Sequence, residues 1–182
     1  MNMEMWILSA VDICKTVNQY WYGKGVLRLM DKATPLKETW DAVAGEYSIE
    51  IEKGEFELAA GIADILIKQG ILPNAEILEL GCGSGHLSAV LAMKGYKTTL
   101  LDFSTVSLEK AKQTYAYYGV GGEFICADIL NLNGNDFAQY ALVWNSGVME
   151  HFNDASIINA FHSIQQLNAD NLLLLVPNPV AI

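Results

Sequence analysis

The stretch AEILELGCGSGHLSAVLAMKG (75–95) decides the fold. Its first seven residues form an apolar run typical of a buried strand, and the run leads into three glycines spaced G-x-G-x-G. Apolar residues then recur at three- and four-residue steps until Gly95, as in a helix that glycine ends. This order predicts the first strand-helix unit of an open α/β sheet, in which ligands bind beyond the carboxyl ends of the strands.

The rest of the chain repeats this alternation without an internal repeat or a low-complexity linker. It predicts an α/β fold with a doubly wound, mostly parallel sheet of about five strands, built from residues 54–182. Helices are expected at 54–70, between Ser104 and Gly119, and from Phe152 to Ile164. Strands after the first are expected at 97–103, 123–128, 140–147 and 171–177.

Residues 1–53 are predicted to form a separate, mainly helical N-terminal segment. The apolar opening (1–14) is interrupted by Glu4 and Asp12 and is too short to span a bilayer. We interpret it as a helix that packs on the core rather than as a membrane-surface anchor, because it has no basic face. The segment is rich in aromatic residues, which suit either a lid or cap over a site or plain packing.

The composition of the chain limits the kinds of partner and site that it can have. The 182 residues include 11 basic and 21 acidic side chains, so the formal charge of -10 disfavours nucleic acid and anionic membranes. The three cysteines, Cys14, Cys82 and Cys126, lie far apart and have no histidine at ligand spacing. They predict neither a disulfide framework nor a metal site, and a reducing cytoplasm fits them best.

The glycine spacing separates three kinds of nucleotide site. A dinucleotide site prefers G-x-G-x-x-G, but His86 stands at the last position and Gly85 comes one residue early. A P-loop needs Gly-Lys-Ser/Thr after the loop, and this is missing. The loop therefore favours a nucleoside ligand lying against the backbone over a pyrophosphate on the helix N-terminus.

An acidic residue, one apolar residue and G-x-G-x-G resemble the first motif of class I S-adenosylmethionine-dependent methyltransferases, which have a Rossmann-like fold. The resemblance covers about residues 40–179. It implies that Glu79 orients the amino group of the cofactor's methionine part, that Asp102 accepts from both ribose hydroxyls, and that Asp128 accepts from the adenine amino group. The implied cofactor-binding residues are Glu79, Gly81, Cys82, Gly83, Gly85, Asp102, Phe103, Asp128, Ile129, Asn145, Ser146, Gly147 and Tyr47.

Two residues after the fourth predicted strand are candidates for catalysis. The methyl group on a sulfonium is already activated, so the protein has chiefly to align the nucleophile and exclude water. A hydroxyl acceptor would need a base, and His151 suits that task because histidine titrates near neutrality. Glu150 is the alternative base or a substrate-positioning group, and helix capping or packing is the structural alternative for both residues.

The sequence predicts a methyltransferase acting on a small molecule, with the methylated atom undetermined. A NAD-linked oxidoreductase and a cofactor-binding module without catalysis are the alternatives. The resemblance also implies two further strands after residues 171–177, one of them antiparallel, so the domain is expected to be incomplete at its C-terminus. The fifth strand would then be an exposed apolar edge through which two copies could pair as a homodimer.

Overall fold

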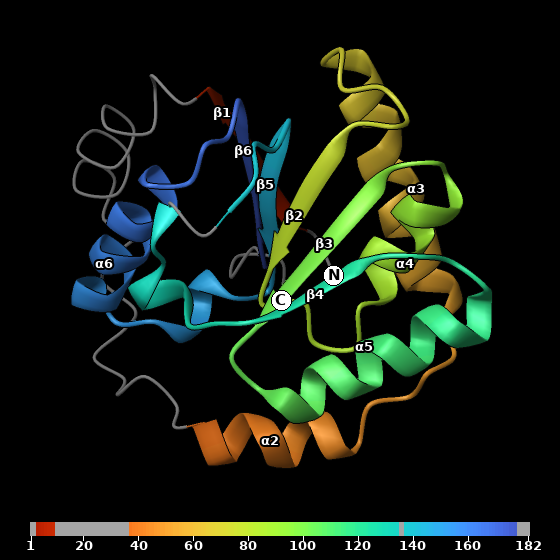
Figure 1. Ribbon diagram of the computed structural model, residues 1–182, viewed down its shortest axis with the longest axis horizontal. Coiled ribbons are helices and arrows are strands. Elements are labelled where there is room, and N and C mark those ends of the chain that lie inside the picture. Colours follow the sequence, from red (N-terminus) through yellow and green to blue (C-terminus); the bar gives the residue numbers. More distant parts are fainter. Residues whose placement is uncertain (1–2, 10–36, 135–136, 178–182) are drawn as a thin grey trace.

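The computed structural model describes residues 3–9, 37–134 and 137–177. A six-stranded sheet forms the centre of the molecule, with the strand order β1-β6-β5-β2-β3-β4 (Figure 1). Five strands, β2 to β6, run parallel, and β1 runs antiparallel beside β6. The elements in chain order are β1 (Met3–Ser9), α2 (Lys37–Gly45), α3 (Lys53–Lys68), β2 (Glu76–Leu80), α4 (His86–Met93), β3 (Lys97–Asp102), α5 (Thr105–Tyr118), β4 (Glu123–Cys126), the 3-10 turn η3 (Ile129–Asn131), β5 (Leu142–Ser146), the 3-10 turn η5 (Met149–His151), α6 (Asp154–Gln165) and β6 (Asn171–Pro177).

The five predicted parallel strands and the helices between them are confirmed, with ends that differ by a few residues at most. The signals used to place the helix ends are present as local structure. Ser104 caps α5 by accepting a hydrogen bond from the Ser107 amide at 3.1 Å, and Gly119 ends that helix in the left-handed conformation with φ 65°.

The N-terminal prediction is confirmed in one part and wrong in another. Helix α2 lies within the predicted helical segment 1–53, but Met3–Ser9 form a strand instead of a helix. Tertiary structure explains why these residues form a strand. A short apolar run suits a strand as well as a helix, and here the edge of β6 supplies the backbone partners for a strand. The rest of the predicted N-terminal helix, residues 1–2 and 10–14, and the following residues up to 36 lie outside the described residues.

The expectation of an exposed edge at the fifth parallel strand is also wrong. That strand is β6, and β1 pairs along it from Met3 opposite Pro177 to Ser9 opposite Asn171. Its backbone groups therefore have a partner within the same chain, and pairing of two copies through this strand loses its basis.

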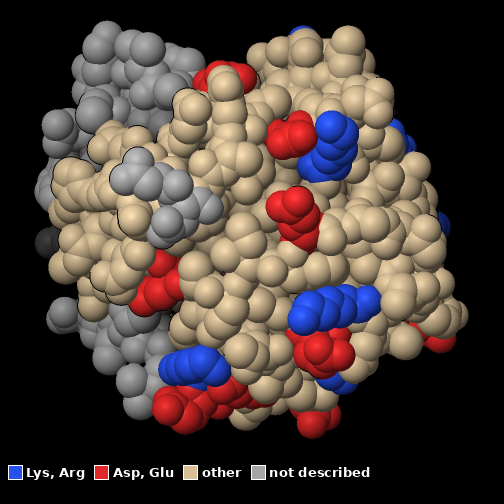
Figure 2. Space-filling view, in the orientation of Figure 1, with Lys and Arg blue, Asp and Glu red and all other residues tan. Residues whose placement is uncertain are grey.

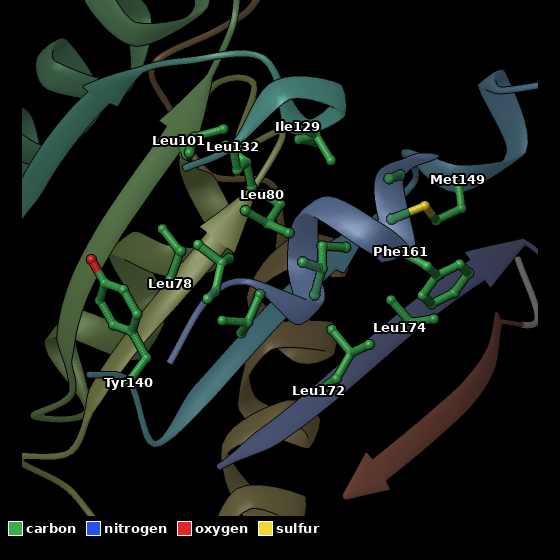
Figure 3. Packing of buried hydrophobic residues seen from close by; sticks show 14 of the residues in the cluster. Leu78, Leu80, Leu101, Ile129, Leu132, Tyr140, Met149, Phe161, Leu172 and Leu174 are labelled. Carbon is green, nitrogen blue, oxygen red and sulfur yellow. The ribbon is translucent and has the colours of Figure 1, made fainter. Parts of the chain in front are cut away.

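Two apolar layers hold the sheet in place. Helices α3, α4 and α5 lie on one face of the sheet and α6 on the other (Figure 1). The layer on the α6 face joins leucines of β2 and β6 to Phe161 of α6 and Met149 of η5 (Figure 3). Because successive residues of a strand point to opposite faces, Leu78 and Leu80 enter this layer while Ile77 enters the other. This packing fixes the carboxyl ends of the strands, where the candidate site lies.

None of the described helices is long and apolar enough to cross a membrane.

Candidate functional site

A cavity of about 660 Å³ opens at the carboxyl ends of β2, β3, β4 and β5. Most of the residues predicted for the site line it: Tyr47, Glu79, Gly81, Cys82, Gly83, Asp102, Phe103, Asp128, Ile129, Ser146, Gly147 and His151.

The glycine loop (81–85) forms the floor of this cavity between β2 and α4. The amides of Gly81 and Cys82 both donate to the Leu101 carbonyl oxygen, at 2.7 and 3.0 Å, which ties the loop to the end of β3. A Cβ on Gly81 would lie 2.6 Å from a methyl group of Val148, and a Cβ on Gly83 would lie 3.4 Å from the Tyr47 ring. At Gly81 a side chain would have to displace Val148, whereas at Gly83 a Cβ would only touch the Tyr47 ring; at both positions the positive φ favours glycine.

Gly85, although part of the same motif, has a different environment. It is not among the cavity-lining residues, and its Cβ would lie 2.8 Å from Leu100 and 2.9 Å from Ala111. Its missing side chain therefore lets α4 pack closely against β3 and α5. The prediction that Gly85 contacts the cofactor stays a prediction, because Gly85 does not line the cavity.

Asp102 ends β3 and is 5% exposed. Its Oδ2 accepts from the Gly83 amide at 3.0 Å, and its Oδ1 accepts from the Ser104 amide at 2.9 Å. Burial raises the pKa of this carboxyl, while the hydrogen bonds from backbone amides oppose the rise. Each oxygen keeps a lone pair for a hydroxyl group in the cavity.

Glu79 lies on the neighbouring strand β2 and is 3% exposed. Burial, with a further contribution from the charge of Asp102, raises its pKa to about 8, and the neighbouring Ser88 opposes part of this rise. Its Oε2 is buried and has no hydrogen-bond partner among the described residues. Because an unpaired buried carboxylate is costly, this position calls for a cation or a donor from the cavity.

The ends of β4 and β5 provide the other walls. Asp128 is exposed and caps η3, where its Oδ1 accepts from the Leu130 amide at 2.9 Å. Ser146 and Gly147 follow β5 and line the cavity. Asn145 does not line it: this residue is fully buried, and both polar atoms of its side chain lack a partner within the described structure.

The two candidate catalytic residues occupy different places. His151 lines the cavity, and its ring contacts the ring of Trp40 edge-on, with centroids 4.7 Å apart and planes at 73°. Glu150 is half-buried and does not line the cavity, and burial raises its pKa. The structure therefore brings His151 to the cavity and leaves Glu150 beside it.

The N-terminal segment covers part of the cavity. Helix α2 contributes Lys37 and Trp40 to its wall and lies beside α5 (Figure 1). The Ser104 hydroxyl donates to Asp41 Oδ1 at 2.5 Å, and Lys37 forms an ion pair with the same carboxylate at 2.8 Å. These bonds lower the pKa of Asp41, the one to Lys37 most. The position suits the predicted lid or cap, which stays a prediction.

Sequence reasoning missed several residues of the wall. The sequence places Trp40 in an aromatic-rich segment but predicts no contact for it, and it singles out His86 only as the residue that breaks the dinucleotide spacing. Val148 lies three residues before His151 and Phe152 directly after it, and this closeness in sequence is the available signal for them. The lining residues outside the prediction are Lys37, Trp40, Glu55, Ser84, His86, Leu87, Ser107, Ala127, Leu130, Val148 and Phe152.

Three carboxylates at the ends of adjacent strands set the chemistry of the site: Glu79, Asp102 and Asp128. They suit a ligand with an ammonium group and several hydroxyl or amino donors. Within residues 3–9, 37–134 and 137–177, no three His, Cys, Asp or Glu side chains form a group that could hold a metal ion.

Comparison with known proteins points to one family. A family model described as a methyltransferase domain matches residues 77–170. The ribosomal RNA small subunit methyltransferase C of Pseudomonas aeruginosa is 32% identical over 108 residues, which cover 52% of this chain and 32% of that protein. The ubiquinone biosynthesis O-methyltransferase of Pseudoalteromonas translucida is 31% identical over 140 residues, covering 76% of this chain and 58% of the relative. The chain thus spans about a third of the length of the first relative and somewhat over half of the length of the second.

Solved structures show the same fold. Phosphoethanolamine N-methyltransferase 1 of Haemonchus contortus superposes with a TM-score of 0.54 at 21% identity, covering 72% of this chain and 28% of that one. Magnesium protoporphyrin IX methyltransferase of Synechocystis, with bound S-adenosylmethionine, superposes with a TM-score of 0.50 at 20% identity, covering 85% and 70%.

Proposed function

The chain belongs to the methyltransferase-domain family, and we propose that it binds S-adenosylmethionine in the cavity and transfers the methyl group to a small-molecule acceptor. Glu79 is the observation that carries this proposal. Its buried carboxyl lines the cavity beside the glycine loop, and its Oε2 has no partner in the described part of the chain. The ammonium group of the cofactor's methionine part would supply that partner.

The other cavity residues fit the rest of the cofactor. Asp102 has one free lone pair on each oxygen for the two ribose hydroxyls, because each oxygen already accepts one backbone amide. Asp128 and Ile129 at the end of β4 would hold the adenine, and Phe103 would pack against it. Ser146 and Gly147 would border the methionine part, and Gly81, Cys82 and Gly83 of the glycine loop line the same cavity.

When bound, the cofactor supplies a methyl group that its sulfonium has already activated. The work of this chain is then to hold the acceptor in line with the methyl group and keep water out. His151 lines the cavity and would accept the proton of an acceptor hydroxyl. Its edge-on contact with Trp40 limits how the imidazole can turn, and Phe152 adds an apolar wall next to it.

Charge favours a small molecule over RNA as acceptor. The net charge is -10, and several lysines are paired with acidic side chains, among them Lys37 with Asp41 and Lys97 with Glu76. On the face shown in Figure 2, the prominent basic side chains lie beside acidic ones. A polyanion would meet little attraction on this face. Relatives act on both kinds of acceptor by name, and the net charge of -10 supports the small molecule in this chain.

Two other functions are weaker. A NAD-linked oxidoreductase would need space for a pyrophosphate at the start of α4, where His86 and its partners Glu55 and Ser48 lie instead. A binding module without catalysis would not need a base in the cavity, where His151 lies. The proposal places the enzyme in the cytoplasm, where the free thiols of Cys82 and Cys126 stay reduced.

Calorimetry against S-adenosylmethionine, S-adenosylhomocysteine and NAD tests the cofactor. We expect the first two to bind and NAD to give no heat. A cell extract incubated with enzyme and methyl-labelled cofactor, then separated into RNA and molecules below protein size, tests the acceptor. Label in the small molecules is expected. Binding of NAD alone would overturn the methyltransferase proposal, and label confined to RNA would overturn the small-molecule acceptor.

A further inference from the structure

His86 makes two hydrogen bonds that no role assigned so far explains. It is the first residue of α4, directly after the glycine loop, and is 6% exposed. Its Nδ1 lies 2.8 Å from Glu55 Oε2, and its Nε2 lies 3.0 Å from the Ser48 carbonyl oxygen. The ring thus joins α4 to Glu55, which lies in α3, and to Ser48, which lies before α3.

Both partners of the ring are acceptors. A carbonyl oxygen can only accept, so Nε2 donates to Ser48. Glu55 Oε2 also accepts from the Glu52 amide at 2.9 Å, as part of the capping box that starts α3. An ionised carboxylate carries no proton to donate, so Nδ1 is the donor to Glu55 Oε2 as well. A neutral imidazole has one N–H, and only the imidazolium can make both bonds.

The surrounding charges agree with a cation paired to Glu55. The N-terminus of α4 by itself disfavours a positive ring, because the helix dipole is positive there. Glu55 offsets this at 2.8 Å, and Asp102 lines the same cavity from β3. Lys37 of α2, the basic residue that also lines the cavity, is paired with Asp41.

The bond to Ser48 holds a segment that we call the strap, residues 46–52. The strap carries Tyr47, whose ring lies against the glycine loop at Gly83. Two bonds from α5 hold it on the far side: Lys110 Nζ donates to the Tyr47 carbonyl oxygen at 3.1 Å, and the Ile51 amide donates to the Tyr118 hydroxyl at 2.9 Å. His86 is the corresponding link to α4.

We propose that His86, as an imidazolium bonded to Glu55 and Ser48, is a positioning residue that holds the strap and Tyr47 over the glycine loop and thereby slows release of the nucleoside cofactor. The part of this inference that concerns cofactor release rests on the proposed function. The protonation and the attachment of the strap do not.

Nitrogen NMR of the histidine rings at neutral pH, without ligand, tests the protonation. We expect both nitrogens of His86 to carry a proton in the wild type, and one of them to lose it in Glu55→Gln, which keeps the shape of the side chain but removes its charge. The exposed His162 on α6 is the matched control, and His162→Gln assigns its signals. A neutral His86 ring in the wild type would overturn the imidazolium.

Stopped-flow release of S-adenosylhomocysteine tests the positioning. His86→Gln is expected to speed release about tenfold, and His162→Gln is expected to leave it unchanged. Because His86 acts through Tyr47, the effects of His86→Gln and Tyr47→Ala should not add in the double variant. Additive effects would overturn the positioning role, as would an unchanged release rate in both His86→Gln and Glu55→Gln.

The two proposals can fail separately. If the wild type does not bind S-adenosylhomocysteine, the proposed function fails. Backbone hydrogen exchange of the strap then still decides the attachment: faster exchange over residues 46–52 in His86→Gln and Glu55→Gln supports it, and unchanged exchange in both variants overturns it.

Discussion

Cofactor affinity should rise with pH, and Glu79 should be the cause. Burial raises the pKa of its carboxyl to about 8, so at pH 7 about one molecule in eleven has it ionised. The ammonium group of the ligand needs the ionised form. Binding at pH 7 is therefore expected to be about tenfold weaker than the limit reached above pH 9, and from pH 6 to pH 8 affinity should rise about fiftyfold.

Calorimetry with S-adenosylhomocysteine from pH 6 to 9 measures this slope, and Glu79→Gln is the control. The glutamine cannot ionise, so any slope that remains in the variant belongs to the ligand's own amino group. Repeating the titration at pH 7 in buffers of different ionisation enthalpy should show release of about 0.9 proton by the wild type and none by the variant. Equal slopes in the two proteins, or no proton release, would refute the assignment of Glu79 to the ammonium group.

The same carboxyl should affect stability without any ligand. Its pKa in the folded protein is raised, so the folded state holds a proton that the unfolded chain gives up above its ordinary pKa of 4.5. The stability of the wild type should therefore fall as pH rises from about 4.5 to about 8. Glu79→Gln lacks this fall, and the difference in denaturation midpoint between the two proteins should widen over that range. A constant difference would show that the carboxyl is already ionised in the fold.

Three further substitutions test the site. Asp102→Ala should weaken S-adenosylhomocysteine binding by about 1.5–3 kcal/mol, the range for hydrogen bonds to a charged group, and unchanged calorimetric affinity would remove Asp102 from the ribose site. Gly83→Val should abolish binding in a folded protein, because φ is 53° there and the valine side chain would meet Tyr47. Gly121→Val is the control, since a side chain at Gly121 would enter open space. Near-normal affinity of Gly83→Val would contradict this geometry. His151→Ala should lower turnover about 10²-fold with little change in cofactor affinity, whereas a joint loss of rate and binding would indicate a structural role.

The parts of the fold that depend on local pattern could be predicted from sequence. The glycine loop, the Ser104 cap and the Gly119 stop are each set by residues close in the chain, and all three have the expected form. The strand at Met3–Ser9 could not be predicted, because its partner β6 lies more than 160 residues away and a short apolar run does not specify which partner it will meet.

The same distinction applies to the site. Residues that a strand end delivers, such as Glu79 and Asp102, could be placed from the alternation of strands and helices alone. Residues that come from elsewhere could not: Trp40 reaches His151 across more than 100 positions, and His86 reaches Ser48 across 38. In both cases a local pattern shows the residue but not its partner, because the contact depends on how α2 and the strap pack against the sheet.

The packing of β1 also bears on how the site is kept rigid. β6 is bonded to β5 on one side and to β1 on the other, so it is an interior strand, and the Gly147 amide that follows β5 donates to the Leu175 carbonyl oxygen of β6 at 3.1 Å. Gly147 lines the cavity, and His151 lies four residues further on. An edge strand frays more readily than an interior one, because fewer backbone bonds hold it. By pairing with β6, the N-terminal strand therefore supports, through β6 and Gly147, the wall of the cavity that carries the candidate base.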